Sequence, residues 1–406
     1  MRRPRMPSIL PVTFLVAAGA WNPVTAVETD PPAPQEAPLV LGLPVRVSTL
    51  PGTMKLPVIE AALIDDDEWL VVLGGMKKDF TASPAIQLRT PQGTWRPVGA
   101  QMKEARINPS AIALENGRVF VWGGYGGSAR KDLVQRIDGE LLQPKVAGSA
   151  QLITPPSGSD WSDASNPVRL PEGSVGMVVK DQLQRFDAGD AGRWVSPIPL
   201  GRSLQGPTLA RLEDGRLLAC GTSEAGTDYL VIEIDPSNET ATLWKEPLGV
   251  PALGGRLHHL PDGRLMLLGW TRLGSALESG SLILDPASRS AEVGPNLPTD
   301  TNALTWMSSH TVDAGVLVLG TEVTPPAGAG DSPTAPKPVS YLLRMEGSGG
   351  LRAWSLNKLP PRRRPMARPA GKRTVELIGG YRFGAGGAAM ENTSVLVNYG
   401  TGLVGD

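Results

Sequence analysis

Short apolar segments that end in glycine recur along the chain at nearly constant spacing. Taking the first glycine of each segment, they close at Gly74, Gly123, Gly221, Gly269, Gly320 and Gly379. The intervals are 49, 98, 48, 51 and 59 residues, and because 98 is twice 49, one degenerate unit is expected near residue 172. There, Pro171-Glu172-Gly173 precedes an apolar run over residues 175–179 that lacks the closing glycines. Seven units of similar length predict a repeat architecture.

Each unit has the same order of predicted strands. The pairs Asn116-Gly117, Asp214-Gly215 and Asp262-Gly263 indicate tight hairpin turns between a first and a second strand. The second strand is almost continuously apolar, as expected for a strand buried on both faces. A variable loop leads to a third strand, for example residues 229–235, and a fourth strand often carries tryptophan, as at Trp95, Trp194, Trp244 and Trp354. This order predicts an all-β chain of four-stranded antiparallel sheets.

The Asp-Gly turn, the apolar strand, the Gly-Gly doublet and the downstream tryptophan together resemble kelch repeats. The resemblance covers residues 43–406 and implies a seven-bladed β-propeller of four-stranded blades around a central axis. Three units depart from the family pattern by keeping one glycine of the doublet, at Gly221, Gly269 and Gly320, and the third unit keeps neither. Kelch propellers serve as enzymes, binding modules and scaffolds, so the resemblance predicts a fold and leaves the activity open.

The two ends of the repeat region predict how the ring closes. The last unit, residues 368–406, supplies three strands and no tryptophan-bearing fourth. Residues 45–50 precede the first unit and resemble the fourth strand of the unit that contains Trp95. We therefore expect the N-terminal strand to join the last blade as its outer strand, which removes a free sheet edge.

The first residues have the pattern of a secretory signal peptide. Arg2, Arg3 and Arg5 precede an apolar stretch over residues 9–21, and Val24-Thr25-Ala26 places small residues at a cleavage position. Residues 1–26 are therefore predicted to be removed after Ala26, and residues 27–42 to form a disordered linker. An uncleaved anchor is the alternative. The mature protein is expected to be a secreted or periplasmic monomer, bacterial in origin, without a transmembrane segment.

Charge and cysteine content exclude some classes of partner and site. Lys and Arg number 39 and Asp and Glu 40, so the chain has no overall basic field and nucleic acid is a poor candidate partner. Cys220 is the only cysteine, which excludes an intrachain disulfide. It ends an apolar strand, where a small buried side chain is expected.

Arginine collects in the segments that we expect on one face of the ring. In a propeller, the loops between second and third strands share a face with the links between blades, and this face commonly binds ligands. Arginine suits a carboxylate, sulfate or phosphate group because guanidinium donates two parallel hydrogen bonds. The alternative is that these arginines are solvated or pair with acidic residues in neighbouring loops. The predicted ligand-binding residues are Arg106, Arg202, Arg256, Arg272, Arg364, Trp122 and Trp270.

The histidines do not predict a metal site. His259 and His310 both lie ten residues before a unit glycine, in a repeat position that other units fill with Ile64 or Ala113. A position that accepts such residues is structural, so we expect no metal, and we assign no cofactor and no catalytic residue.

Two functions remain open from the sequence. The first is a non-catalytic module that binds a glycan or a protein in the cell envelope or outside the cell. The alternative is a carbohydrate-active enzyme that resembles the sialic acid mutarotases or, less closely, the copper radical oxidases. The second resemblance implies two tyrosines, two histidines and a cysteine joined to a tyrosine, and none of the five tyrosines of this chain adjoins a histidine.

Overall fold

The computed structural model describes residues 41–42, 45–66, 69–128, 130–189, 192–226, 228–244, 252–273, 276–294, 304–322, 337–345, 351–356, 359, 362, 364–371, 373–384 and 387–399. Residues 37–406 form one compact unit. The predicted signal peptide and most of the predicted linker lie outside the described residues. Within the described part, no helix is long and apolar enough to cross a bilayer.

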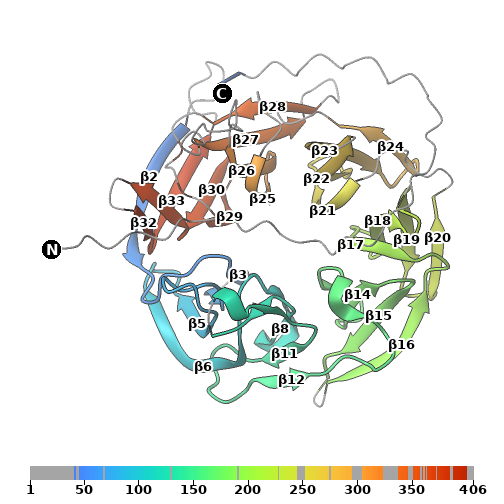
Figure 1. Cartoon of the computed structure of the whole chain (residues 1–406), viewed down its shortest axis with the longest axis horizontal. Helices are drawn as coiled ribbons and strands as arrows, with labels where there is room; N and C mark the ends of the chain where they lie inside the picture. The colour runs from blue at the N-terminus through green and yellow to red at the C-terminus, as the bar shows by residue number, and fades with distance from the viewer. Residues whose placement is uncertain are drawn as a thin grey trace, which may run out of the picture. The chain divides into compact units, whose positions relative to one another are not determined.

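Seven four-stranded antiparallel sheets are arranged as the blades of a ring (Figure 1). Blades 1 to 3 each take four strands, from the inner to the outer edge. They are β3 (Ala62–Asp66), β4 (Trp69–Leu73), β5 (Ser83–Arg89) and β6 (Trp95–Arg106); β7 (Ser110–Ala113), β8 (Val119–Trp122), β11 (Gly139–Leu142) and β12 (Gln151–Ile153); and β13 (Val168–Arg169), β14 (Val175–Val179), β15 (Gln182–Asp187) and β16 (Arg193–Pro199).

Blades 4 to 6 repeat the same order. Their strands are β17 (Leu204–Arg211), β18 (Leu217–Ser223), β19 (Tyr229–Asp235) and β20 (Thr240–Leu243); β21 (Ala252–His259), β22 (Leu265–Leu273), β23 (Ala276–Asp285) and β24 (Ser290–Val293); and β25 (Leu304–Val312), β26 (Gly315–Glu322), β27 (Lys337–Met345) and β28 (Leu351–Ser355). The predicted all-β, seven-bladed fold is confirmed.

The last blade confirms the predicted closure. It consists of β29 (Met366–Gly371), β30 (Thr374–Ile378) and β33 (Thr393–Tyr399), and its outer strand is β2 (Val45–Thr53) from the other end of the chain. Val45 pairs with Tyr399 and Thr49 with Val395. In addition, β1 (Leu41–Gly42) pairs in parallel with β28 on the outer edge of blade 6.

Glycine doublets decide where the second strand ends in blades 7, 1 and 2. Gly123 and Gly124 adopt φ of 66° and 82°, and the doublets at Gly74 and Gly379 have the same left-handed conformation. A Cβ on Gly124 would lie 2.6 Å from the carbonyl oxygen of Ile107, so only glycine fits there. The chain then turns into a separate short hairpin, β9 (Tyr125–Gly126) with β10 (Val134–Gln135) in blade 2 and β31 (Tyr381–Gly384) with β32 (Gly387–Met390) in blade 7. Blades 5 and 6 lack the doublet, and their second strands continue straight.

The third blade is irregular because the link before it replaces part of its inner strand. β13 has two residues, and Asn166 continues the contact with blade 4. Its side chain donates to the carbonyl oxygen of Leu209 at 2.9 Å and accepts from the Leu209 N–H at 3.1 Å. The second and third strands are joined by a two-residue turn, in which Lys180 has φ of 55°.

The core lies between blades. The described residues form seven buried apolar clusters, one at each of the seven interfaces between neighbouring blades. The interface between blades 2 and 3 is aromatic, with the rings of Trp122, Trp161 and Trp194 within 6 Å of one another by centroid. This packing holds every blade to its two neighbours and gives the loops a rigid base.

Candidate anion-binding site

The links before blades 7, 1 and 2 meet one another near the inner strands. Ile59 pairs with Met76 and Ile107 with Tyr125, so the links before blades 1 and 2 are each bonded to the first residue after a glycine doublet. We call the face that carries these links and the loops between second and third strands the loop face. It is the face on which the sequence places the ligand site.

Three non-glycine residues on these links have a left-handed backbone. Glu60, Asn108 and Arg364 have φ of 54°, 52° and 48°, and each lies two residues before the inner strand of its blade. The Asn108 N–H donates to the carbonyl oxygen of Glu60 at 2.6 Å, and the Arg364 guanidinium pairs with the Glu60 carboxylate. Left-handed backbone costs energy in residues with a side chain, and such strain collects at functional sites.

Arg106 is a structural residue of the link between blades 1 and 2. Its side chain is fully buried, and its Nε lies 3.1 Å from Glu140 while its Nη2 lies 2.9 Å from Asp138. Its Nη1 also donates to the carbonyl oxygen of Gly123 at 2.9 Å. Arg106 therefore anchors the glycine doublet of blade 2, and the structure does not present it to a ligand.

Arg362 has the same role before blade 7. Its Nη1 donates to the carbonyl oxygens of Gly379 and Thr393 at 3.2 and 2.7 Å. Burial lowers its pKa from the usual arginine value. Arg364, two residues later, pairs with Glu60, and burial lowers its pKa to about 10. Both of these link arginines thus have partners, in agreement with the alternative reading of the arginine-rich face.

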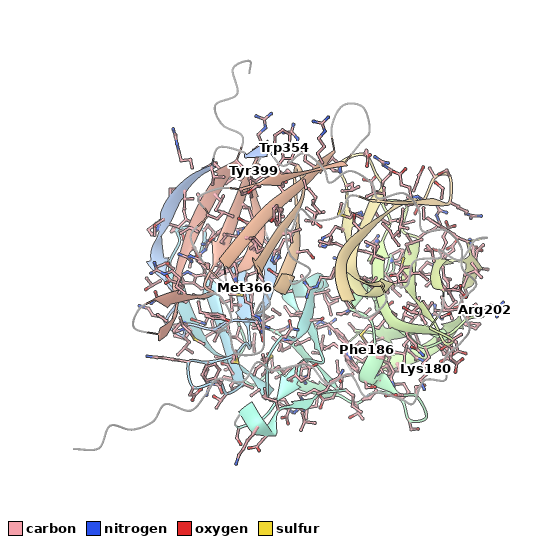
Figure 2. The ribbon with its side chains drawn as sticks, turned by 45° about the horizontal axis from the view of Figure 1, so that its top comes forward. Lys180, Phe186, Arg202, Trp354, Met366 and Tyr399 are labelled. Carbon is pink, nitrogen blue, oxygen red and sulfur yellow. The ribbon has the colours of Figure 1, made fainter. Side chains whose placement is uncertain are left out.

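Arg202 and the two tryptophans lie in different surroundings. Arg202 is exposed, and Figure 2 shows it at the outer margin of the ring, away from the inner-strand residue Met366. Trp122 is 4% exposed, and its ring packs against those of Trp161 and Trp194. The backbone of Trp270 and Arg272 belongs to β22, while their side chains lie outside the described residues.

Arg256 differs from the paired arginines. It lies within β21, the inner strand of blade 5, and not in the link where the sequence places it. Its side chain is accessible to solvent, yet burial among the surrounding protein lowers its pKa. It makes no hydrogen bond or ion pair with any part of the chain that the structure describes. Its guanidinium is therefore open to an anion from outside the chain.

All three histidines of the chain lie near Arg256. His258 follows it by two residues on β21, and its ring nitrogens lie 2.8 Å from Ser309 Oγ and 3.1 Å from Thr311 Oγ1 on β25. Burial, and then the charge of Arg256, lower the pKa of His258 to about 3. We call Arg256, His258, His259, Ser309 and Thr311, together with Ser308 and His310, the Arg256 cluster.

His310 completes the cluster from blade 6. Its Nε2 lies 3.2 Å from Ser308 Oγ, and burial and then the charge of Arg256 lower its pKa to about 3. The shared repeat position relates His259 to His310, whereas the contact between blades 5 and 6 is made by His258, which this position does not single out. In the sequence, this contact corresponds to the alternating residues Arg256-x-His258 on one strand and Ser309-x-Thr311 on the other. The two patterns can be related only when the inner strands of blades 5 and 6 are known to be neighbours.

Among the described residues, we find neither a site for a metal ion nor a reactive cysteine. Among them, no three His, Cys, Asp or Glu side chains are arranged to hold a metal ion. Cys220 is fully buried in β18, and burial raises its pKa. A thiol with a raised pKa is a poor nucleophile.

Comparison with known proteins supports the fold and no more specific property of the chain. No protein-family model matches the chain, and no curated protein sequence matches it. A solved structure of a catalytically inactive virginiamycin B lyase from Staphylococcus aureus with quinupristin is 12% identical, with a TM-score of 0.51, over 88% of this chain and 99% of that one. A structure of YjhT is 12% identical, with a TM-score of 0.45, over 85% and 96%. The strand order and the first of these comparisons agree, and the chain is a seven-bladed β-propeller.

Proposed function

We propose that this chain is an exported kelch-type propeller that binds an anionic ligand, with Arg256 as the principal contact. The observation that carries the proposal is the contrast among the arginines. Arg106, Arg362 and Arg364 have protein partners, whereas Arg256 is accessible and has none within the described residues. An incoming anion would supply the missing partner.

The surroundings of Arg256 favour binding over mere solvation. Burial among protein atoms lowers the pKa of Arg256, although the side chain as a whole is exposed to solvent. A carboxylate, sulfate or phosphate group that approaches it gains a charge-assisted hydrogen bond in a region of reduced dielectric constant, where such bonds are stronger. The same anion at a fully solvated arginine such as Arg202 gains much less.

The scaffold supports a binding role. Inner strands packed at every blade interface hold Arg256 and its neighbours in a fixed arrangement, and a preorganised site spends less free energy on ordering when a ligand binds. The glycan or protein partner expected from the sequence would present its anionic group to this site.

The kelch assignment and the export of the chain are part of the proposal. The left-handed doublets at Gly74, Gly123 and Gly379 support the first. The basic and apolar pattern before Ala26 supports the second. Expression of the full chain in a bacterial host should yield a mature protein that begins at Val27, as N-terminal sequencing of the envelope or secreted fraction would reveal. A chain that retains Met1 in the cytoplasm would contradict export.

A thermal-shift experiment on residues 27–406 tests the ligand class. Acidic sugars are compared with neutral glycans, for wild type and Arg256→Ala. A ligand at 100 times its Kd stabilises a fold by about 2.7 kcal/mol, so a bound acidic sugar should raise the melting temperature clearly.

The matched control is Arg96→Ala, which removes the same charge from an exposed position on the outer strand β6. We expect the shift to persist in Arg96→Ala and to disappear in Arg256→Ala. An equal shift in both variants would place the ligand elsewhere. No shift with any anion would contradict the proposal and favour an uncharged protein partner.

A further inference from the structure

The Arg256 cluster carries one full positive charge, and this limits the charge of its ligand. This inference rests on the proposed function. Besides Arg256, the cluster contains three imidazoles and three hydroxyl groups, on the inner strands of blades 5 and 6. The number of charges therefore depends on the protonation of the histidines.

The two histidines nearest to the blade interface are neutral at ordinary pH. His258 is 4% exposed and bonded through both ring nitrogens to hydroxyl groups of blade 6. The groups that act electrostatically on it are Arg256, His310 and His259, and Arg256 also acts on His310. Burial of the two rings, and then the positive charge of Arg256, disfavour protonation and lower both pKa values to about 3.

The hydroxyl groups add hydrogen-bonding capacity without charge. Ser309 and Thr311 face His258, and Ser308 faces His310. A neutral imidazole donates one hydrogen bond and accepts another. The cluster can thus form hydrogen bonds with several oxygen atoms of a ligand, but its single positive charge can neutralise only one negative charge.

We propose that the Arg256 cluster selects singly charged anions, such as carboxylates and sulfate monoesters, over doubly charged phosphate monoesters. A second negative charge would enter the same desolvated region without a partner, and an unpaired charge there is costly. Geometry alone would not separate a sulfate from a phosphate ester, because both present three oxygens in a similar arrangement.

The test compares glucose 6-sulfate with glucose 6-phosphate by calorimetric titration at two pH values. At pH 7.5 the phosphate ester is mostly doubly charged, and at pH 5.0 it is mostly singly charged, because its second pKa is about 6. The experiment uses the wild-type protein, with Arg256→Ala as the control for binding at the cluster. His258 and His310 remain neutral at both.

We expect glucose 6-sulfate to bind at least about tenfold more tightly at pH 7.5 (about 1.4 kcal/mol) and the two affinities to agree within about threefold at pH 5.0. Phosphate binding that equals or exceeds sulfate binding at pH 7.5, while depending on Arg256, would overturn the charge selection and leave the proposed function intact. No binding of either probe would contradict both.

A substitution should reverse the selection. His310→Lys places a second cation in the cluster, and we expect it to raise the affinity for glucose 6-phosphate at pH 7.5 by tenfold or more relative to the wild type. Unchanged phosphate affinity in a folded His310→Lys protein would contradict the role of charge.

Discussion

Arg368 on the inner strand of blade 7 binds Asp65 on the inner strand of blade 1, with its Nη1 2.8 Å from both carboxylate oxygens. Its Nε lies 2.9 Å from Glu376, which is fully buried and also pairs with Arg89 of blade 1. Two arginines and two carboxylates thus join the blades at which the chain begins and ends. The closure of the ring is held by charge as well as by the outer strand β2.

Removing Glu376 should destabilise this interface strongly. Glu376→Gln leaves Arg89, which is 7% exposed, without its carboxylate, and we expect the free energy of unfolding to fall by about 3–5 kcal/mol in urea denaturation. Glu115→Gln breaks an exposed pair with Arg169 and should cost less than about 1 kcal/mol. Similar losses in the two variants would mean that burial of the Glu376 pair has no energetic importance.

The N-terminal strand should be essential for stability. Deletion of residues 43–50 from the mature chain removes Val45 and Val47, which pack against the apolar cluster between blades 6 and 7, and opens the edge of β33. We expect the free energy of unfolding to fall by about 3 kcal/mol or more, measured by denaturant titration. Deletion of residues 27–40 is the control and should have little effect. An unchanged transition after deletion of residues 43–50 would contradict closure by β2.

Glycine should be better than lysine at the turn of blade 3. Lys180 is exposed and has φ of 55°, a conformation that glycine adopts without steric cost. We expect Lys180→Gly to raise the stability by about 0.5–1 kcal/mol. Asp181→Gly changes the neighbouring position, where φ is not positive, and should lower stability. A loss of stability in Lys180→Gly would indicate that the lysine side chain contributes contacts that outweigh the backbone strain.

Stability should fall in mild acid because His258 resists protonation. Its pKa is about 3 in the folded protein, below the ordinary value of about 6.5 that applies after unfolding. Below pH 6.5 the unfolded chain therefore binds a proton that the folded chain does not. The folded state loses stability as the pH falls towards 3, and no further below it.

Between pH 7 and pH 5, this linkage should cost the wild type up to about 2 kcal/mol relative to His258→Gln. Urea denaturation of both proteins at the two pH values measures the difference. The prediction concerns only the change in stability between the two pH values, and not the difference between the two proteins at pH 7. Parallel pH dependence in the two proteins would contradict it.

The fold could be predicted because each repeated signal corresponds to a backbone requirement. At the predicted turns, Gly215 and Gly263 have φ of 90° and 86°, values that residues with a side chain rarely adopt. In the sequence, the third blade can be recognised only from the doubled interval between unit glycines. The reason is that Lys180 occupies a left-handed backbone position that is usually a glycine. Its short inner strand could not be foreseen, since the hydrogen bonds of Asn166 to blade 4 depend on the path of the link.

The candidate site was harder to predict because ion pairing depends on segments that are distant in sequence. Arg106 and Arg256 look alike as arginines near a blade boundary. The carboxylates of Glu140 and Asp138 reach only the first of them. Trp122 ends an apolar strand, and the sequence does not reveal that its ring turns towards Trp161 of the next blade.

The pairing of β2 with β33 also sets the order of events during synthesis. The strand that completes the last blade is made first, and it must wait for Thr393–Tyr399 before it has a partner. Contacts between such distant segments form slowly, because the chain loses the entropy of closing a long loop before the contacts stabilise it. A chain that stops before residue 393 would keep the open edge of β30 and a lone β2, and each could pair with another copy. Incomplete chains of this protein are therefore expected to aggregate, even though the finished ring is closed.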